Sequence, residues 1–238
     1  MSSFNMTAIV WDELDTTELK EPETYHNFTE DPLLISCTLY RMIKESAENK
    51  KYMYANWSLT EHMDKIAAKI TNEDRIFAGV IKSYYRSKLL VAKLRNEHFT
   101  NYRNDLVQFL EEAPLKVSTK FIGMIYKLPY FYAYDMKITE IFGGEYASVD
   151  GSLQRRDSVT IDFIDTVHTG RKRSTAFEYW FKDSSDNRIV VEVEKHNPVR
   201  NLWDSVVREK PITISGKFEK KRKDTLEYYV ATGWSINV

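Results

Sequence analysis

The run Phe177-Glu178-Tyr179-Trp180-Phe181 puts Phe177, Tyr179 and Phe181 on one side of an extended chain, with Glu178 and Trp180 on the other. Such alternation of period two predicts a β-strand with one buried face. Comparable alternation recurs at residues 159–163, 189–194, 212–218 and 226–236. Residues 157–238 are therefore expected to form five short strands.

Turn and helix signals separate these strands. Residues 183–187, Asp-Ser-Ser-Asp-Asn, are typical of a turn, because Asn and Asp bond their own backbone and tolerate left-handed conformations. Asn197 as cap and Pro198 at the first helical position predict a helix of about ten residues that Pro211 ends. Gly216 marks a bend or bulge in the fourth strand.

Two predicted connections are strongly basic: Gly170-Arg171-Lys172-Arg173 and Lys220-Lys221-Arg222-Lys223. The order strand, strand, strand, helix, strand, strand favours a five-stranded Greek-key barrel of the oligonucleotide/oligosaccharide-binding (OB) type. The two basic runs would then be the loops after strands 1 and 4, which such barrels use to grip nucleic acid.

Parts of this region resemble small OB-like modules of bacteriophage replication proteins. Tyr179-Trp180-Phe181-Lys182-Asp183, followed by Asp186-Asn187-Arg188, resembles their F-x-F-K-D-x-x-G-N hairpin. Residues 212–218, Ile-Thr-Ile-Ser-Gly-Lys-Phe, resemble their V-x-L-x-G-T-V-K strand. The resemblance covers the last third of the chain, with Asp186 where the pattern has Gly and Glu192 near its usual Trp. It implies an OB-like fold and a role with nucleic acid.

Residues 32–112 carry helical periodicity instead. Apolar residues recur every three or four positions in residues 33–47, and Ser58-Leu59-Thr60-Glu61 and Thr71-Asn72-Glu73-Asp74 are helix start signals. Residues 77–110 form either one long helix or two that join near residues 96–100. One side is basic (Lys82, Arg86, Lys88, Lys93, Arg95 and Arg103), which predicts either a solvated face or a surface that tracks phosphates.

The predicted fold class is α+β, an N-terminal helical bundle followed by a C-terminal OB-like antiparallel β-barrel. The expected domains are an acidic arm at 1–31, a helical domain at 32–113 and a β-rich OB-like domain at 114–238. Aromatic, β-prone residues at 117–148 are expected to add two strands and an irregular crossing. The arm is either solvated and partly pinned, a protein-binding segment, or an acidic mimic that competes for the basic surfaces.

Composition limits the classes of function. The net charge of -1 excludes a generically basic nucleic-acid binder, so any such role must rest on local patches. A single cysteine suggests a reducing compartment, and no signal peptide or apolar run of spanning length is evident. The expected location is the cytoplasm, that of a bacterial host if the protein is phage-encoded, with no membrane partner.

No pattern of catalytic or metal-ligating residues stands out. The five histidines are scattered, without a His-Glu-x-x-His spacing, and Gly143-Gly144 lacks the Lys and Ser/Thr of a phosphate loop. Carboxylates on the predicted strands are expected to be cross-strand charge pairs. The protein is therefore expected not to be an enzyme and to need neither metal nor cofactor.

The leading hypothesis is a non-catalytic protein that binds single-stranded nucleic acid in phage-like replication or recombination, with DNA preferred to RNA as the ligand. Basic side chains would neutralise phosphates and aromatic rings would stack on bases. The alternative is a protein-interaction adaptor (a helicase loader, a replisome assembly factor or an inhibitor of a host protein) that uses the barrel as scaffold. The residues expected to bind nucleic acid are Arg155, Arg156, Arg171, Lys172, Arg173, Trp180, Lys217, Lys220, Lys221, Arg222, Lys223 and Tyr229.

Overall fold

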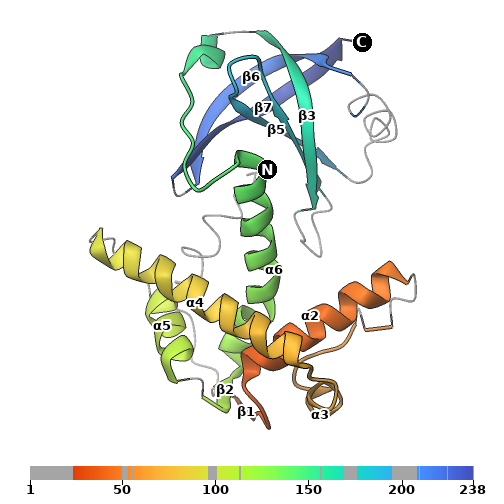
Figure 1. Ribbon diagram of the computed structural model, residues 1–238, viewed down its shortest axis with the longest axis vertical. Coiled ribbons are helices and arrows are strands. Elements are labelled where there is room, and N and C mark those ends of the chain that lie inside the picture. The colour runs from red at the N-terminus through yellow and green to blue at the C-terminus, as the bar shows by residue number, and fades with distance from the viewer. Residues whose placement is uncertain are drawn as a thin grey trace. The chain divides into compact units, whose positions relative to one another are not determined.

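The computed structural model describes residues 24–49, 53–54, 56–95, 101–112, 114–155, 157–168, 176–194, 208, 210–223 and 225–237. The chain divides into two compact units, Met1–Tyr132 and Ala133–Val238. The division falls inside helix α6 (Thr119–Phe142), which therefore contributes to both units (Figure 1). The expected boundary between residues 113 and 114, by contrast, precedes α6.

The helices of the first unit begin largely where capping residues predict. Helix α2 (Pro32–Glu48) is confirmed, and the Asp31 Oδ1 accepts from the Leu33 N–H at 3.0 Å. Helix α4 (Asn72–Leu94) opens with a reciprocal capping box between Thr71 and Asp74. The Ser58 signal is displaced: Ser58 accepts from the Glu61 N–H at 3.3 Å, but α3 (Met63–Ala67) begins two residues beyond Glu61.

Two helices, not one, follow Thr71. Helix α4 ends at Leu94, and α5 (Asn101–Glu112) is a separate element; residues 96–100 lie outside the described residues. The end of the expected acidic arm is part of the fold, since β1 (Tyr25–Asn27) pairs with β2 (Lys116–Ser118) and Phe28 is buried. The core of this unit includes Leu33, Ile35, Leu39, Ile66, Ile81, Leu106, Leu110, Ile125 and Leu128.

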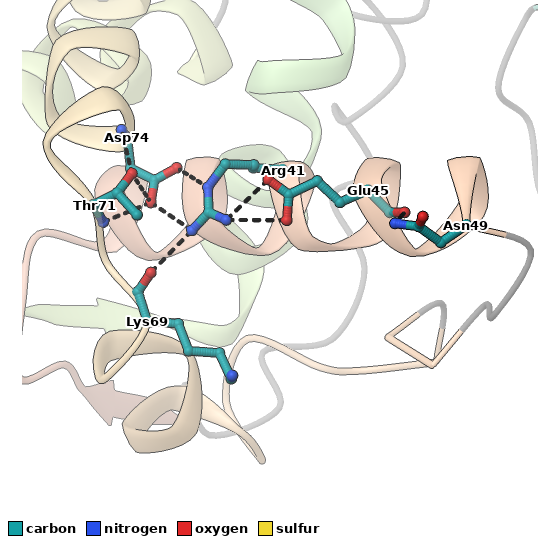
Figure 2. A network of polar contacts seen from close by, with 6 residues as sticks. All are labelled: Arg41, Glu45, Asn49, Lys69, Thr71 and Asp74. Carbon is teal, nitrogen blue, oxygen red and sulfur yellow. Dashed lines mark hydrogen bonds and ion pairs between the residues drawn. The ribbon is translucent and has the colours of Figure 1, made fainter.

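An ion pair between the buried Asp74 and the partly exposed Arg41 joins α2 to α4. The Arg41 guanidinium on α2 donates to both oxygens of Asp74, at 2.8 and 2.9 Å, and also to the Lys69 carbonyl and to Glu45 (Figure 2). The Asp74 carboxylate also accepts from the Thr71 N–H and hydroxyl. One carboxylate therefore both starts α4 and holds it against α2.

The prediction of two further strands within residues 117–148 is wrong. Apart from the three-residue β2, most of this segment is helix α6, which contains Pro129. Because proline has no N–H, it removes the helical donor to the carbonyl four residues earlier, that of Ile125. The buried Ser36 hydroxyl on α2 donates to this carbonyl at 3.0 Å, so the helix continues through Pro129 without an unsatisfied acceptor.

The second unit contains the expected barrel. Strands β3 (Ser158–His168), β4 (Ala176–Lys182), β5 (Arg188–Glu194), β6 (Ile212–Lys223) and β7 (Leu226–Asn237) close in the order β3-β4-β5-β7-β6. This closed five-stranded arrangement is consistent with an OB-like barrel. It is not wholly antiparallel, because β7 returns from β6 to lie parallel to β5. The helix predicted after Asn197 lies outside the described residues.

The alternation within β4 and β5 is confirmed. Tyr179 and Phe181 lie in the barrel interior with Ile189, Val191 and Val193, whereas Trp180 and Val190 face outwards. The turn predicted at residues 183–187, before β5, is also confirmed. The Asp183 carboxylate accepts from the N–H groups of Ser185 and Asn187, at 2.9 Å each, and Asp186 has a φ of 63°. Asp186 thus occupies a left-handed position that Gly fills in the resembling hairpin.

The last strand changes face partway along. Its even-numbered residues were expected to share one side, but Leu226, Tyr228 and Val230 face outwards while Trp234 and Ile236 contact the interior cluster. The change coincides with a bulge whose extra residue lies in β7 and not in β6 as predicted: Gly233 and Trp234 together oppose Gly216, between the pairs Ser215–Ser235 and Lys217–Thr232. A Cβ on Gly216 would lie 3.0 Å from the Thr232 carbonyl oxygen, so the bulge needs glycine.

Candidate nucleic-acid interface

The basic run at residues 220–223 is part of a strand. Strands β6 and β7 stay paired up to Lys223 and Leu226, so these residues lie in the last part of β6 and not in a loop. Lys217 precedes them on the same strand. We call Lys217, Lys220, Lys221 and Arg222 the β6 basic strip; each of the four is exposed or partly exposed.

Two carboxylates pair with the three lysines of this strip. The Lys217 and Lys221 ammonium groups lie 3.1 and 3.4 Å from the same Glu219 carboxylate. Lys220 pairs with Glu227 at 2.9 Å. The bond from Lys217 holds the pKa of Glu219 below its usual value, and that from Lys220 does the same for Glu227. Among these three paired lysines, Lys217 is the most exposed, at 76%.

Lys223, the last residue of the basic run, packs against α6 instead of facing solvent. Its ammonium group lies 2.6 Å from Asp135 and 4.3 Å from the centroid of the Tyr134 ring, and its side chain is 11% exposed. Ion pairing and a cation–π contact together hold Lys223 against α6. It is therefore not free to neutralise a phosphate, and the prediction that it binds nucleic acid is withdrawn.

The second half of α6 covers the outer face of the barrel. Ile138, Ile141 and Phe142 are buried against Val167, Trp180, Val190 and Leu226. Polar contacts anchor this half to four strands: Lys137 pairs with Asp165 on β3, Tyr134 bonds Glu178 on β4, Arg188 on β5 donates to the Ile141 carbonyl at 3.0 Å, and Lys223 on β6 pairs with Asp135. The covered face includes β4 and β5, the second and third barrel strands, which OB-type barrels commonly present to oligonucleotides.

Glu178 on this covered face accepts two hydrogen bonds. The Tyr134 hydroxyl donates to it at 2.9 Å and the Trp180 indole at 3.2 Å. Burial nevertheless raises the pKa of Glu178, and nearby Glu192 adds to the rise. Burial, together with these two carboxylates, also raises the pKa of Tyr228 to about 12. This polar cluster holds α6 in register on the barrel.

Two aromatic residues expected to stack on bases are core residues. Trp180 is 2% exposed and lies beneath Phe142, with ring centroids 5.4 Å apart. Tyr229 faces the barrel interior and is 0% exposed. Neither ring face is available to a base, so we withdraw a stacking role for both.

The remaining candidates lie largely outside the described residues. Arg156, Arg171, Lys172 and Arg173 are in this group, and of Arg155 only the backbone is described, as the last residue of the 3-10 helix η1 (Ser152–Arg155). The structure thus places Lys217, Lys220, Lys221 and Arg222 along one strand, with Lys221 opposite outward-facing Tyr228 and Lys220 opposite inward-facing Tyr229. It separates Trp180 and Tyr229 from them by burial.

The basic side of the helical unit contributes mainly to packing. Lys82 pairs with Asp31, Arg86 donates to the Leu110 carbonyl, and the Lys88 ammonium lies 4.8 Å from the centroid of the Tyr84 ring. Lys93 and Arg95 are exposed near the end of α4, and the side chain of Arg103 is not among those described. This side therefore offers fewer phosphate-binding groups than the sequence indicates.

Other types of site find no support among the described residues. Within them, no group of three His, Cys, Asp or Glu side chains could hold a metal ion. No helix in the described ranges has the length and apolar character required to cross a bilayer. Comparison of the chain with protein-family models, curated proteins and solved structures found no match.

Proposed function

We propose that the protein binds single-stranded nucleic acid, with DNA the leading choice, through the β6 basic strip. The observation that supports this most is the strip's position: four cations lie along the fourth strand of a closed barrel with OB-type strand order. The first basic run, residues 170–173, comes before β4 in the sequence, and β4 is a strand of the same barrel. Action in phage-like replication or recombination belongs to the same proposal.

The mode of binding would be electrostatic. With Trp180 and Tyr229 buried, the strip offers Lys and Arg groups to phosphates but no large aromatic ring of its own. Cations that neutralise phosphates release condensed counterions, so binding weakens as salt rises and depends little on base sequence. Lys217, Lys221 and Lys220 would exchange Glu219 and Glu227 for the phosphates of a bound strand.

Fluorescence anisotropy with a labelled single-stranded oligonucleotide tests the proposal. The variant Lys217→Gln/Lys221→Gln/Arg222→Gln removes three strip cations and leaves Lys223, which holds α6. Its affinity should fall, and the slope of log K against log salt should become shallower by about 2, at roughly 0.7 per lost phosphate contact.

The control is Lys65→Gln/Lys69→Gln/Lys127→Gln, which removes the same charge from exposed lysines of the first unit. It should keep the affinity and slope of the unmodified chain. If the strip variant and the control bind alike, or if the unmodified chain does not bind, the proposal is wrong.

The adaptor function remains the second candidate, and one observation favours it. Because α6 covers the outer face of β4 and β5, the barrel buries a surface that a nucleic-acid binder of this type would present. A barrel used as a scaffold for protein partners would tolerate this. The adaptor function would be established if the unmodified chain and the strip variant capture the same protein from host lysate equally well and neither binds an oligonucleotide.

A further inference from the structure

Helix α4 is apolar on two opposite sides. Its buried side carries Ala78, Ile81, Tyr85 and Leu89. At 3.6 residues per turn, a second apolar set returns to the opposite side of the helix. We call this set the α4 stripe; it consists of Ile76, Val80, Leu90, Val91 and Leu94, which are between 42% and 75% exposed.

The stripe is long and has two apolar ends, Ile76 with Val80 and Leu90 with Val91 and Leu94. From Ile76 to Leu94 it extends roughly 27 Å at 1.5 Å per residue. Ser83 and Ser87, both exposed, fill the positions between its two apolar ends. Two exposed apolar patches on the same side of one helix mark an interaction site rather than the scattered apolar residues of an ordinary surface. It has the shape that receives an amphipathic segment along its length.

The charges beside the stripe select the occupant. Arg75, Lys93 and Arg95 are exposed on α4, and Glu73 is the only exposed acidic residue of this helix. A second copy of α4 would bring the same cations opposite one another, which costs free energy. An occupant should therefore combine apolar side chains with negative charge.

The chain contains a segment with this composition. Residues 1–23, outside the described residues, carry six acidic side chains against Lys20 alone. Ile9, Val10, Trp11, Leu14 and Leu19 are interspersed with the acids. Fully extended, 23 residues span at most roughly 80 Å, several times the radius expected for a unit of this size. Asp31, which pairs with Lys82 of α4, ties the start of the described chain to this same helix.

We propose that residues 6–19 dock on the α4 stripe of their own chain, with their apolar side chains on the stripe and their carboxylates beside Arg75, Lys93 and Arg95. The tether makes the contact intramolecular, with an effective concentration on the order of millimolar. Even an interaction too weak to hold a separate peptide is therefore populated. The inference does not depend on nucleic-acid binding by the β6 basic strip.

A nitroxide at Ser87→Cys tests this proposal in the full chain. The native Cys37 is fully buried, and burial raises the pKa of its thiol, so it does not compete for the label. The label should attenuate the backbone amide NMR signals of residues 6–19. The same label in a Leu90→Ser/Leu94→Ser background should lose this attenuation, whereas Leu115→Ser, an exposed leucine off the stripe, should keep it.

Mixed samples distinguish the occupants. When ¹⁵N-labelled chains without nitroxide are mixed with unlabelled nitroxide chains, docking within one chain predicts no attenuation. Attenuation in the mixture would identify a second copy as the occupant and overturn the proposal. Unattenuated signals of residues 6–19 in the singly labelled chain would also overturn it, because the stripe would then be left for another protein.

Discussion

Glu178 shows how a single side chain couples the barrel to the helix that covers it. It lies on the outer face of β4, accepts from Tyr134 on α6 and from Trp180, and has a raised pKa because burial disfavours its charge. For a carboxyl whose pKa is raised on folding, the folded state binds more protons. Its contribution to stability is therefore complete below the ordinary pKa of 4.5 and is lost as pH rises through the raised value.

We expect Glu178→Gln to flatten this pH dependence. Glutamine keeps a carbonyl oxygen for the Tyr134 hydroxyl but does not ionise. The free energy of unfolding of the unmodified protein should fall more than that of the variant as pH rises from 4.5 to neutrality. Urea unfolding at several pH values measures both, with Asp162→Asn on the exposed surface of β3 as control. Parallel pH profiles for Glu178→Gln and the unmodified protein would show that the carboxyl is not perturbed.

Two glycines offer a matched pair at the residue scale. A Cβ at Gly216 would approach the backbone of Thr232 to 3.0 Å and that of Trp234 to 3.1 Å, so Gly216→Ala should destabilise by about 1–3 kcal/mol. Gly79 lies within α4 with no atom near the added Cβ, and Gly79→Ala should stabilise by roughly 0.5–1 kcal/mol. Chemical unfolding gives both values; equal effects of the same sign would contradict the bulge geometry.

At the scale of elements, the Arg41–Asp74 pair fixes α2 against α4. Burial alone would raise the pKa of Asp74, but the bonds from Arg41 and Thr71 outweigh it and hold this pKa below its ordinary value of 3.8. A carboxyl with a lowered folded pKa stabilises the protein above its ordinary pKa and loses that contribution as pH falls through the folded value. The joint between these helices should therefore be stable at neutral pH and weaken only in strong acid.

Removing the Asp74 charge should cost about 3 kcal/mol, the lower end of the range for a buried pair that loses one partner. The lower end applies because Arg41 keeps the Lys69 carbonyl and Glu45. Thermal or urea unfolding of Asp74→Asn at neutral pH measures this cost. Glu45→Gln removes only an exposed pair on the same helix and should cost about 0.3–0.5 kcal/mol; a similar cost for both would mean that the buried pair contributes little.

Which elements the sequence predicts depends on how locally each is specified. The sequence predicts strands β4 and β5 from their alternation and the start of α4 from the Thr71–Asp74 capping box. Both signals involve only residues that are close together in the sequence. Helix α6 does not, because Pro129 and its many aromatic residues indicate strands. Its stability depends on Ser36, 89 residues away, which satisfies the Ile125 carbonyl. The spacing of Tyr134, Ile138 and Ile141 is a local sign of a helix.

Contacts between residues distant in the sequence also explain why the candidate site was predicted only in part. The cations of the β6 basic strip were visible as a run, but whether each is exposed depends on α6, which occupies Lys223 and buries Trp180. Tyr229 was placed on the surface because the even residues of β7 were expected to face inwards throughout. The register shift opposite Gly216 reverses the two sides, and a period-two pattern alone does not show such a shift.

At the scale of the whole molecule, α6 determines where the chain can be divided. The core of the first unit includes Val117, Met124, Ile125 and Leu128, all of which follow Pro114. A fragment of residues 1–113 should therefore lack a cooperative thermal transition, whereas residues 1–132 should show one, followed by circular dichroism. Cooperative unfolding of the shorter fragment would show that β2 and the first half of α6 are dispensable for this unit.

The central claim is that single-stranded nucleic acid follows the β6 basic strip and not the face of β4 and β5 that α6 covers. Photochemical cross-linking of an oligonucleotide with a photoreactive base, followed by mass spectrometry of the peptides, tests this most directly. The account predicts cross-links within residues 212–223 that the Lys217→Gln/Lys221→Gln/Arg222→Gln variant loses. Cross-links at Glu178, Trp180 or Val190, on the covered face, would contradict it.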